Sequence, residues 1–68
     1  MKKDQIRINA ENIWKKLGSN LTDTSINKLK RDCKLNMIEL FIALGWLAKE
    51  EKIIFVNYGK IIYVFPTE

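Results

Sequence analysis

The chain has 68 residues and a mass of 8.0 kDa, which leaves room for one small domain with a single core. It is 47% hydrophobic and 29% charged, close to a globular protein and far from a disordered one. With no histidine, one cysteine and three glycines, it lacks the residues of a His/Cys metal cluster, a glycine-rich phosphate loop or an internal disulfide. We therefore expect a cytoplasmic protein that is not an enzyme and has no cofactor, metal site or small-molecule substrate.

Twelve Lys and Arg against eight Asp and Glu give a net charge of +4, which permits contact with nucleic acid without requiring it. The basic N-terminus is followed by polar residues, so we expect no signal peptide. The longest apolar run, residues 40–48, is far shorter than the roughly 20 residues that cross a bilayer, and no membrane partner is expected.

The first helix is predicted at about residues 5–17. Its apolar residues recur at three- and four-residue steps and form one stripe: Ile6, Ala10, Ile13, Trp14 and Leu17. Gly18 is predicted to end this helix, because glycine adopts the left-handed conformation that often follows a helix C-terminus.

The second helix is predicted at about residues 25–33, capped by one of the residues 22–25, and the third at about residues 37–50, capped by Asn36. The apolar side of the second consists of Ile26, Leu29 and Cys33, with Cys33 a small buried hydrophobe. The inward stripe of the third consists of Leu40, Ala43, Leu44 and Leu47. Two runs of β-branched and aromatic residues then predict a hairpin at about residues 53–65. A short strand around Leu21 and Thr22 would complete a three-stranded sheet.

The joint between the second and third helices has helix-turn-helix spacing. Apolar residues stand at offsets 0, 4, 6, 11 and 14, which lets two helices bury their crossing: Leu29, Cys33, Leu35, Leu40 and Ala43. Lys34 occupies the turn where glycine is common, and Lys30 a position where a small residue is frequent. Three helices followed by a hairpin wing predict an α+β winged helix-turn-helix in a single domain, residues 1–68.

The stretches ALGWLAKEEKI at residues 43–53 and NIWKKL at residues 12–17 resemble small stand-alone bacterial winged helix-turn-helix proteins of unassigned function. The resemblance spans nearly the whole chain. It implies a winged-helix fold and a DNA-binding or regulatory role, and it brings no ligand or catalytic residue with it.

The leading hypothesis is a non-enzymatic, transcription-regulator-like module that binds double-stranded DNA. The expected contacts, mostly to phosphates, are Lys28, Arg31, Lys34, Asn36, Glu39, Lys49 and Lys60. Lys15, Lys16 and Lys30 extend the same basic cluster, which a plain solvated helix surface would also explain. On the outer side of the third helix, the polar side chains suited to reading bases are Asn36 and Glu39.

The alternative is a protein-protein interaction or homodimerisation module. A 100° step per residue turns Ile38 and Ile42 outward on the third helix, with Trp46 on its flank. An exposed apolar patch of this kind marks a protein interface. The same three side chains are equally well explained as covered by the chain's own wing or its N-terminal segment.

Overall fold

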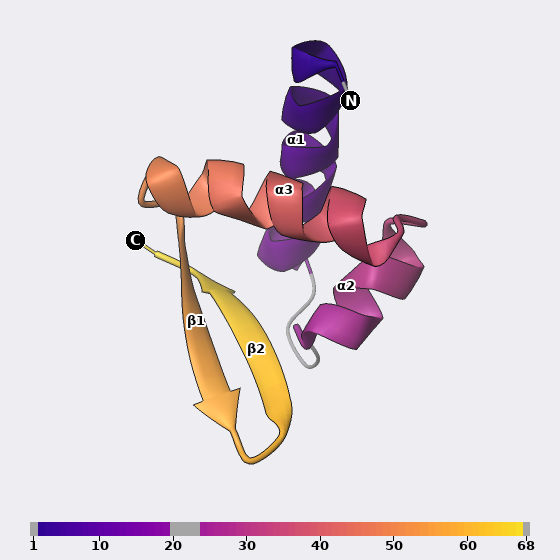
Figure 1. Ribbon diagram of the computed structural model, residues 1–68. Helices are drawn as coiled ribbons and strands as arrows, with labels where there is room; N and C mark the ends of the chain where they lie inside the picture. Colours follow the sequence, from indigo (N-terminus) through magenta and orange to yellow (C-terminus); the bar gives the residue numbers. More distant parts are fainter. Residues whose placement is uncertain (1, 20–23, 68) are drawn as a thin grey trace.

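The computed structural model describes residues 2–19 and 24–67. The elements follow in the order α1 (Lys3–Ser19), α2 (Ile26–Asp32), α3 (Met37–Lys49), β1 (Ile53–Tyr58) and β2 (Ile61–Pro66) (Figure 1). Helix α3 crosses α1, α2 lies near the N-terminal end of α3, and the hairpin extends from the other end of α3 (Figure 1). The predicted α+β architecture of three helices and a hairpin wing is confirmed.

Helix α1 is longer than predicted at both ends. The carbonyl of Lys2 accepts hydrogen bonds from the N–H groups of Gln5 (3.0 Å) and Ile6 (3.1 Å), so the helix begins at Lys3 rather than residue 5. Gly18 was predicted to end the helix, and this is wrong. The backbone of Gly18 stays helical, and the helix continues to Ser19. The glycine with a positive φ is Gly59 instead.

Helix α2 is one residue shorter at each end than the predicted span of residues 25–33. Ser25 lies outside the helix as its N-cap, with extended backbone, and its Oγ accepts the N–H of Lys28 at 3.3 Å. Cys33 is the C-cap, and its N–H donates to the carbonyl of Leu29 at 2.9 Å. Lys34 then takes the left-handed conformation, with φ of 56°, that turns the chain toward α3.

Helix α3 begins at Met37 as predicted and ends at Lys49, one residue before the predicted end, because Glu50 is its C-cap. Asn36 is its N-cap, as the sequence predicted. The apolar stripe predicted to face inward is confirmed, since each of its residues is at most 2% exposed: Leu40, Ala43, Leu44 and Leu47.

The hairpin extends one residue beyond the predicted end at residue 65, because Pro66 is paired with Ile53. The strands are antiparallel with Tyr58 opposite Ile61, and Gly59, with φ of 64°, makes the tight turn between them. On its other side β2 forms a single bridge between Tyr63 and Ser25. The third strand predicted around Leu21 and Thr22 lies outside the described residues.

One core joins all five elements. Its members besides the α3 stripe are Ala10, Ile13 and Leu17 of α1, Ile26 and Leu29 of α2, Ile53 of β1 and Val64 of β2. Burying each large side chain contributes about 1.5–3 kcal/mol relative to leaving it in water, so this core fixes how the three helices and the wing sit together. Asn9, only 4% exposed, lies in the same α1 stripe, and its Nδ2 has no hydrogen-bond partner among the described residues.

Candidate nucleic-acid interface

A continuous basic surface covers the C-terminal ends of α1 and α2 and the turn that follows α2. This surface contains two adjacent hollows. The first is lined by Lys15, Lys16 and Lys34 together with Asn12, Ser19, Asp32 and Cys33. The second is lined by Lys30, Arg31 and Lys34 together with Asn27 and Leu35. Lys34 belongs to both, so these five cations make one surface, which we call the basic surface: Lys15, Lys16, Lys30, Arg31 and Lys34.

Lys28, a predicted DNA contact, is engaged within its own helix. Its Nζ lies 2.8 Å from Asp32 Oδ2, one turn further along α2. The hydrogen bond from Lys28 lowers the pKa of the Asp32 carboxyl, and the nearby charges of Lys16 and Arg31 act in the same direction. At neutral pH the two charges therefore offset each other, and Lys28 adds little net positive charge to its surroundings.

Cys33 lies half-buried at the end of α2 and packs against the core. Desolvation raises the pKa of its thiol, with the negative charge of Asp32 adding to the effect, while Lys16 opposes it. The thiol is therefore protonated at neutral pH, which agrees with the apolar role predicted for it.

The two predicted base-reading residues hold each other in a capping box at the start of α3. Asn36 Oδ1 accepts the N–H of Glu39 at 2.8 Å, and Glu39 Oε1 accepts the N–H of Asn36 at 3.0 Å. Both side chains thus satisfy free amide groups of the helix end. The box uses the oxygen of the Asn36 amide, and its Nδ2 donor takes no part in it.

The outward side of α3 is apolar. Ile38 is 71% exposed, Phe41 47% and Ile42 39%, and we call these three residues the α3 apolar face. Phe41 continues this face into a hollow of about 320 Å³ between α2, α3 and β2, whose other apolar residues include Ile61 and Ile62. Apolar side chains offer no hydrogen bonds to base edges, although they contact thymine methyl groups well.

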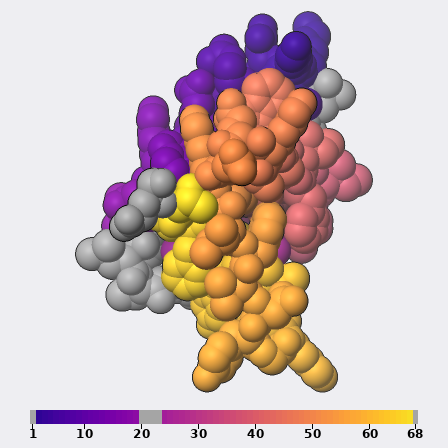
Figure 2. Space-filling view, turned by 90° about the vertical axis from the view of Figure 1, so that its left-hand side faces the viewer, coloured from indigo at the N-terminus to yellow at the C-terminus, as the bar shows by residue number. Residues whose placement is uncertain are grey.

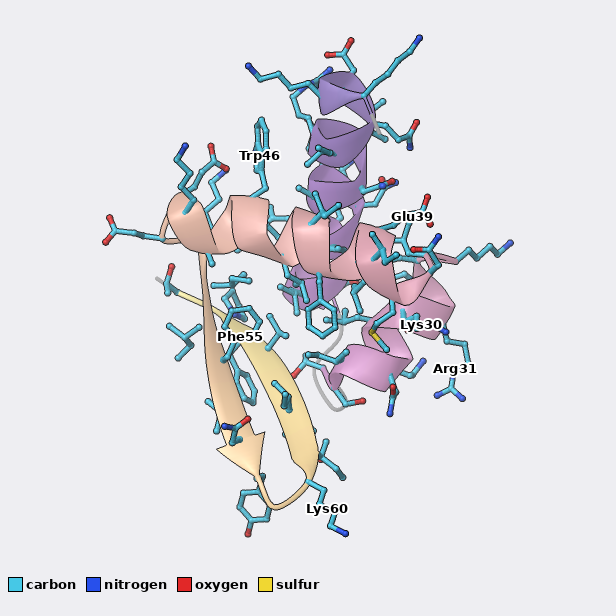
Figure 3. All side chains as sticks on the ribbon, in the orientation of Figure 1. Lys30, Arg31, Glu39, Trp46, Phe55 and Lys60 are labelled. Carbon is cyan, nitrogen blue, oxygen red and sulfur yellow. The ribbon has the colours of Figure 1, made fainter. Side chains whose placement is uncertain are left out.

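Trp46, predicted to share a patch with Ile38 and Ile42, lies on another side of α3. It is half-buried and lines a hollow with Trp14 of α1, whose ring lies 5.8 Å from Lys52 Nζ. Figure 3 shows it pointing from α3 toward the α1 side, away from the hairpin. The structure thus brings Ile38 and Ile42 together on the outer face and separates Trp46 from them.

The remaining predicted contacts lie apart from the basic surface. Lys49 is exposed in the last turn of α3, and Lys60 is exposed at the tip of the hairpin. Figure 3 shows Lys60 at the lower tip of the hairpin, below Lys30 and Arg31, which project from α2. Of the predicted contacts, the structure groups Arg31 and Lys34. Their neighbours Lys15, Lys16 and Lys30 were recognisable in the sequence as members of the same basic cluster.

No group of three or more His, Cys, Asp or Glu side chains is placed to hold a metal ion within residues 2–19 and 24–67. Over the same residues, the helices are too short or too polar to span a membrane.

Comparison with known proteins relates the chain to a protein family and to a solved structure. Residues 1–66 match the family described as "Winged helix-turn-helix domain (DUF2582)". The solution NMR structure of protein BT2368 from Bacteroides thetaiotaomicron is 30% identical, with a TM-score of 0.81 over 97% of this chain and 79% of that one. No curated protein matches. The winged helix-turn-helix is in general a DNA-binding fold and typically a non-catalytic one. The chain belongs to this family of winged helix-turn-helix domains.

Proposed function

We propose that the protein is a non-enzymatic DNA-binding module of the transcription-regulator type that holds double-stranded DNA mainly through its phosphates. The observation that carries this proposal is the basic surface, which gathers five cations on the ends of α1 and α2 and the turn before α3. In helix-turn-helix proteins the helix before the recognition helix crosses the DNA backbone, and the basic surface occupies that position. In a bacterial cell, where the chromosome lies in the cytoplasm, this proposal places the protein in the cytoplasm.

The outward side of the recognition helix, α3, also favours binding through phosphates over reading of bases. The α3 apolar face offers methyl and phenyl groups to the major groove, while Asn36 and Glu39 are used to cap the helix. Phosphate contacts fix affinity and position, and hydrogen bonds to bases fix sequence. We therefore propose that the protein binds DNA mainly through electrostatic attraction and has little sequence preference. In this proposal Asn36 Nδ2 is the donor closest to the bases, and Lys49 and Lys60 are outlying phosphate contacts.

The test compares two triple variants that each remove three positive charges, which lowers the net charge from +4 to +1. One carries Lys30→Gln, Arg31→Gln and Lys34→Asn on the basic surface. The control carries Lys2→Gln, Lys3→Gln and Arg7→Gln at the other end of α1. Binding to a labelled duplex is followed by fluorescence anisotropy over a series of salt concentrations.

Removing one phosphate contact reduces the slope of log K against log salt concentration by about 0.9. We expect the slope of the basic-surface variant to fall by roughly 2–3, and that of the control to stay close to the wild-type value. If the two variants lose affinity equally, only net charge matters and the proposed interface is wrong.

Protein interaction through the α3 apolar face is the second candidate function, and the 71% exposure of Ile38 favours it. A partner protein would cover Ile38, Phe41 and Ile42, whereas water covers them in the isolated chain. For a homodimer the test is Ile42→Glu, with Ile8→Glu as control, because these isoleucines are 39% and 43% exposed on different helices. Sedimentation equilibrium should show self-association lost in Ile42→Glu alone. An equal mass for both variants rejects homodimerisation through this face.

A further inference from the structure

Strand β1 has one open edge. On one side it pairs with β2 along its whole length, while β2 is flanked on its own far side by Ser25 and by Thr24, whose carbonyl accepts the N–H of Val64 at 3.0 Å. On the other side of β1, none of the described residues forms a strand or a bridge with it. Figure 2 views the molecule from this side and shows β1 at the surface of the lower half, in front of β2.

The hydrogen-bonding pattern shows which groups of β1 face this open edge. Residues of an antiparallel pair alternate between those bonded to the partner and those turned away from it. The N–H of Val64 turns away from β1 to reach Thr24, whereas the carbonyl of Lys52 turns toward the β2 side to accept the N–H of Thr67 at 2.8 Å. Phe55 is opposite Val64, so it turns its own N–H and carbonyl outward. By the same alternation, Ile53 and Asn57 do so as well.

This edge lacks the features that keep exposed strands from pairing. Natural edge strands carry charges, prolines or bulges that prevent contact with another strand. The sequence of β1, IIFVNY, contains no charged residue and no proline, and its register with β2 runs from Ile53 to Tyr58 without a bulge. Three consecutive residues at its centre, Ile54, Phe55 and Val56, are exposed.

We propose that β1 pairs antiparallel with β1 of a second copy of this chain, around a two-fold axis at Phe55, to form a continuous four-stranded sheet. In this register the outward N–H of Phe55 donates to the carbonyl of Phe55 in the second copy, and its own carbonyl accepts the N–H of that residue. Ile53 of each copy bonds to Asn57 of the other. Every outward-facing group of the strand is thereby satisfied, and Ile54 lies directly opposite Val56 of the other copy.

The distribution of charge favours a second copy as the occupant. Glu50, Glu51 and Lys52 precede β1, with Glu50 Oε1 3.7 Å from Lys52 Nζ, and Lys60 follows the strand in the hairpin turn. Antiparallel pairing around Phe55 brings the Lys60 turn of one copy to the end of the strand where Glu51 of the other copy lies, and Glu51 forms no ion pair among the described residues. The helical bodies, which carry most of the positive charge, come to lie at opposite ends of the shared sheet, so their mutual repulsion is small.

The available surface sets the strength of this association. If a residue of this size exposes about 200 Å² in full, the exposed fractions of Ile54, Phe55, Val56 and Tyr58 leave roughly 400 Å² on each copy. Stable interfaces bury about 800 Å² per partner. We therefore expect a dimer that dissociates on dilution.

Sedimentation equilibrium measures the mass of the full chain without DNA, over concentrations up to the highest at which the protein does not precipitate. Ile54→Lys is compared with Ile61→Lys, because these isoleucines are 50% and 49% exposed on the same face of the hairpin, one on the edge strand and one on β2. We expect a concentration-dependent dimer in the wild type and in Ile61→Lys, and its loss in Ile54→Lys. Circular dichroism confirms that each variant is folded.

Cross-linking tests the register. In a Cys33→Ala background, Ile54→Cys and Val56→Cys chains are oxidised separately and as a mixture. Because residue 54 lies opposite residue 56, the mixture should form the disulfide-linked dimer faster than either variant alone. A monomer at all concentrations overturns the proposal, as does a dimer that survives Ile54→Lys or is lost in Ile42→Glu alone. Neither measurement involves DNA, so a result that overturns the dimer does not bear on the proposed DNA binding.

Discussion

Lys34 has a left-handed backbone in the turn between α2 and α3, where φ is 56°. For a residue with a Cβ atom this conformation costs roughly 1–2 kcal/mol, and glycine adopts it freely. We expect Lys34→Gly to raise the free energy of unfolding by up to about 1 kcal/mol in urea denaturation. The same variant removes a charge from the basic surface, so its affinity for DNA should fall while its stability rises.

The control for this prediction is Lys30→Gly, because Lys30 lies within α2 and has an ordinary helical backbone. There glycine should lower the free energy of unfolding by about 1 kcal/mol, because it loses more conformational freedom in a helix than lysine does. A loss of stability in both variants would contradict the account of the turn.

Some single residues were predictable from the sequence and others were not. Asn36 was recognisable as a helix cap because it precedes an apolar stripe. Asn9 was missed, although it stands three residues after Ile6 and four before Ile13 on the α1 stripe, because an amide side chain is rarely buried. Its spacing from Ile6 and Ile13 puts Asn9 on the buried side of α1, but its polar side chain argued against burial.

At the scale of the element, α3 depends on its first turn. Asn36→Ala removes the acceptor for the N–H of Glu39, which should lower the free energy of unfolding by about 1 kcal/mol. Asn36→Asp keeps an acceptor at the same place and should retain most of the stability. Chemical denaturation of both variants checks this. An unchanged stability in Asn36→Ala would show that the capping box does not hold α3.

Helices and strands were predictable to within two residues because their apolar residues recur at the spacing of the element they form. The error at Gly18 has a physical reason. Glycine inside a helix costs only about 1 kcal/mol, and the packing of Ile13 and Leu17 in the core outweighs it. The side of α3 on which Trp46 lies was also not predictable from the sequence, because neighbouring elements decide where a residue on the flank of a helix packs. Here the neighbour is Trp14 of α1.

At the scale of the whole molecule, the basic surface and the open edge of β1 lie on different elements. The first belongs to the helices and the second to the wing, so DNA binding through the basic surface and pairing of two copies share no residue except the outlying contact Lys60. A two-fold dimer would present two basic surfaces, the arrangement with which dimeric helix-turn-helix proteins bind paired half-sites.

The central claim is that the basic surface binds DNA, and a backbone amide NMR titration with a mixed-sequence duplex at low salt tests it most directly. Non-specific binding with dissociation constants of roughly 10⁻⁴ to 10⁻⁶ M shows clearly in such spectra. We predict shifts at residues 30–36 and in the last turn of α1 that disappear as salt is added. An absence of shifts, or shifts that persist at high salt and are confined to β1 or the α3 apolar face, would contradict the claim.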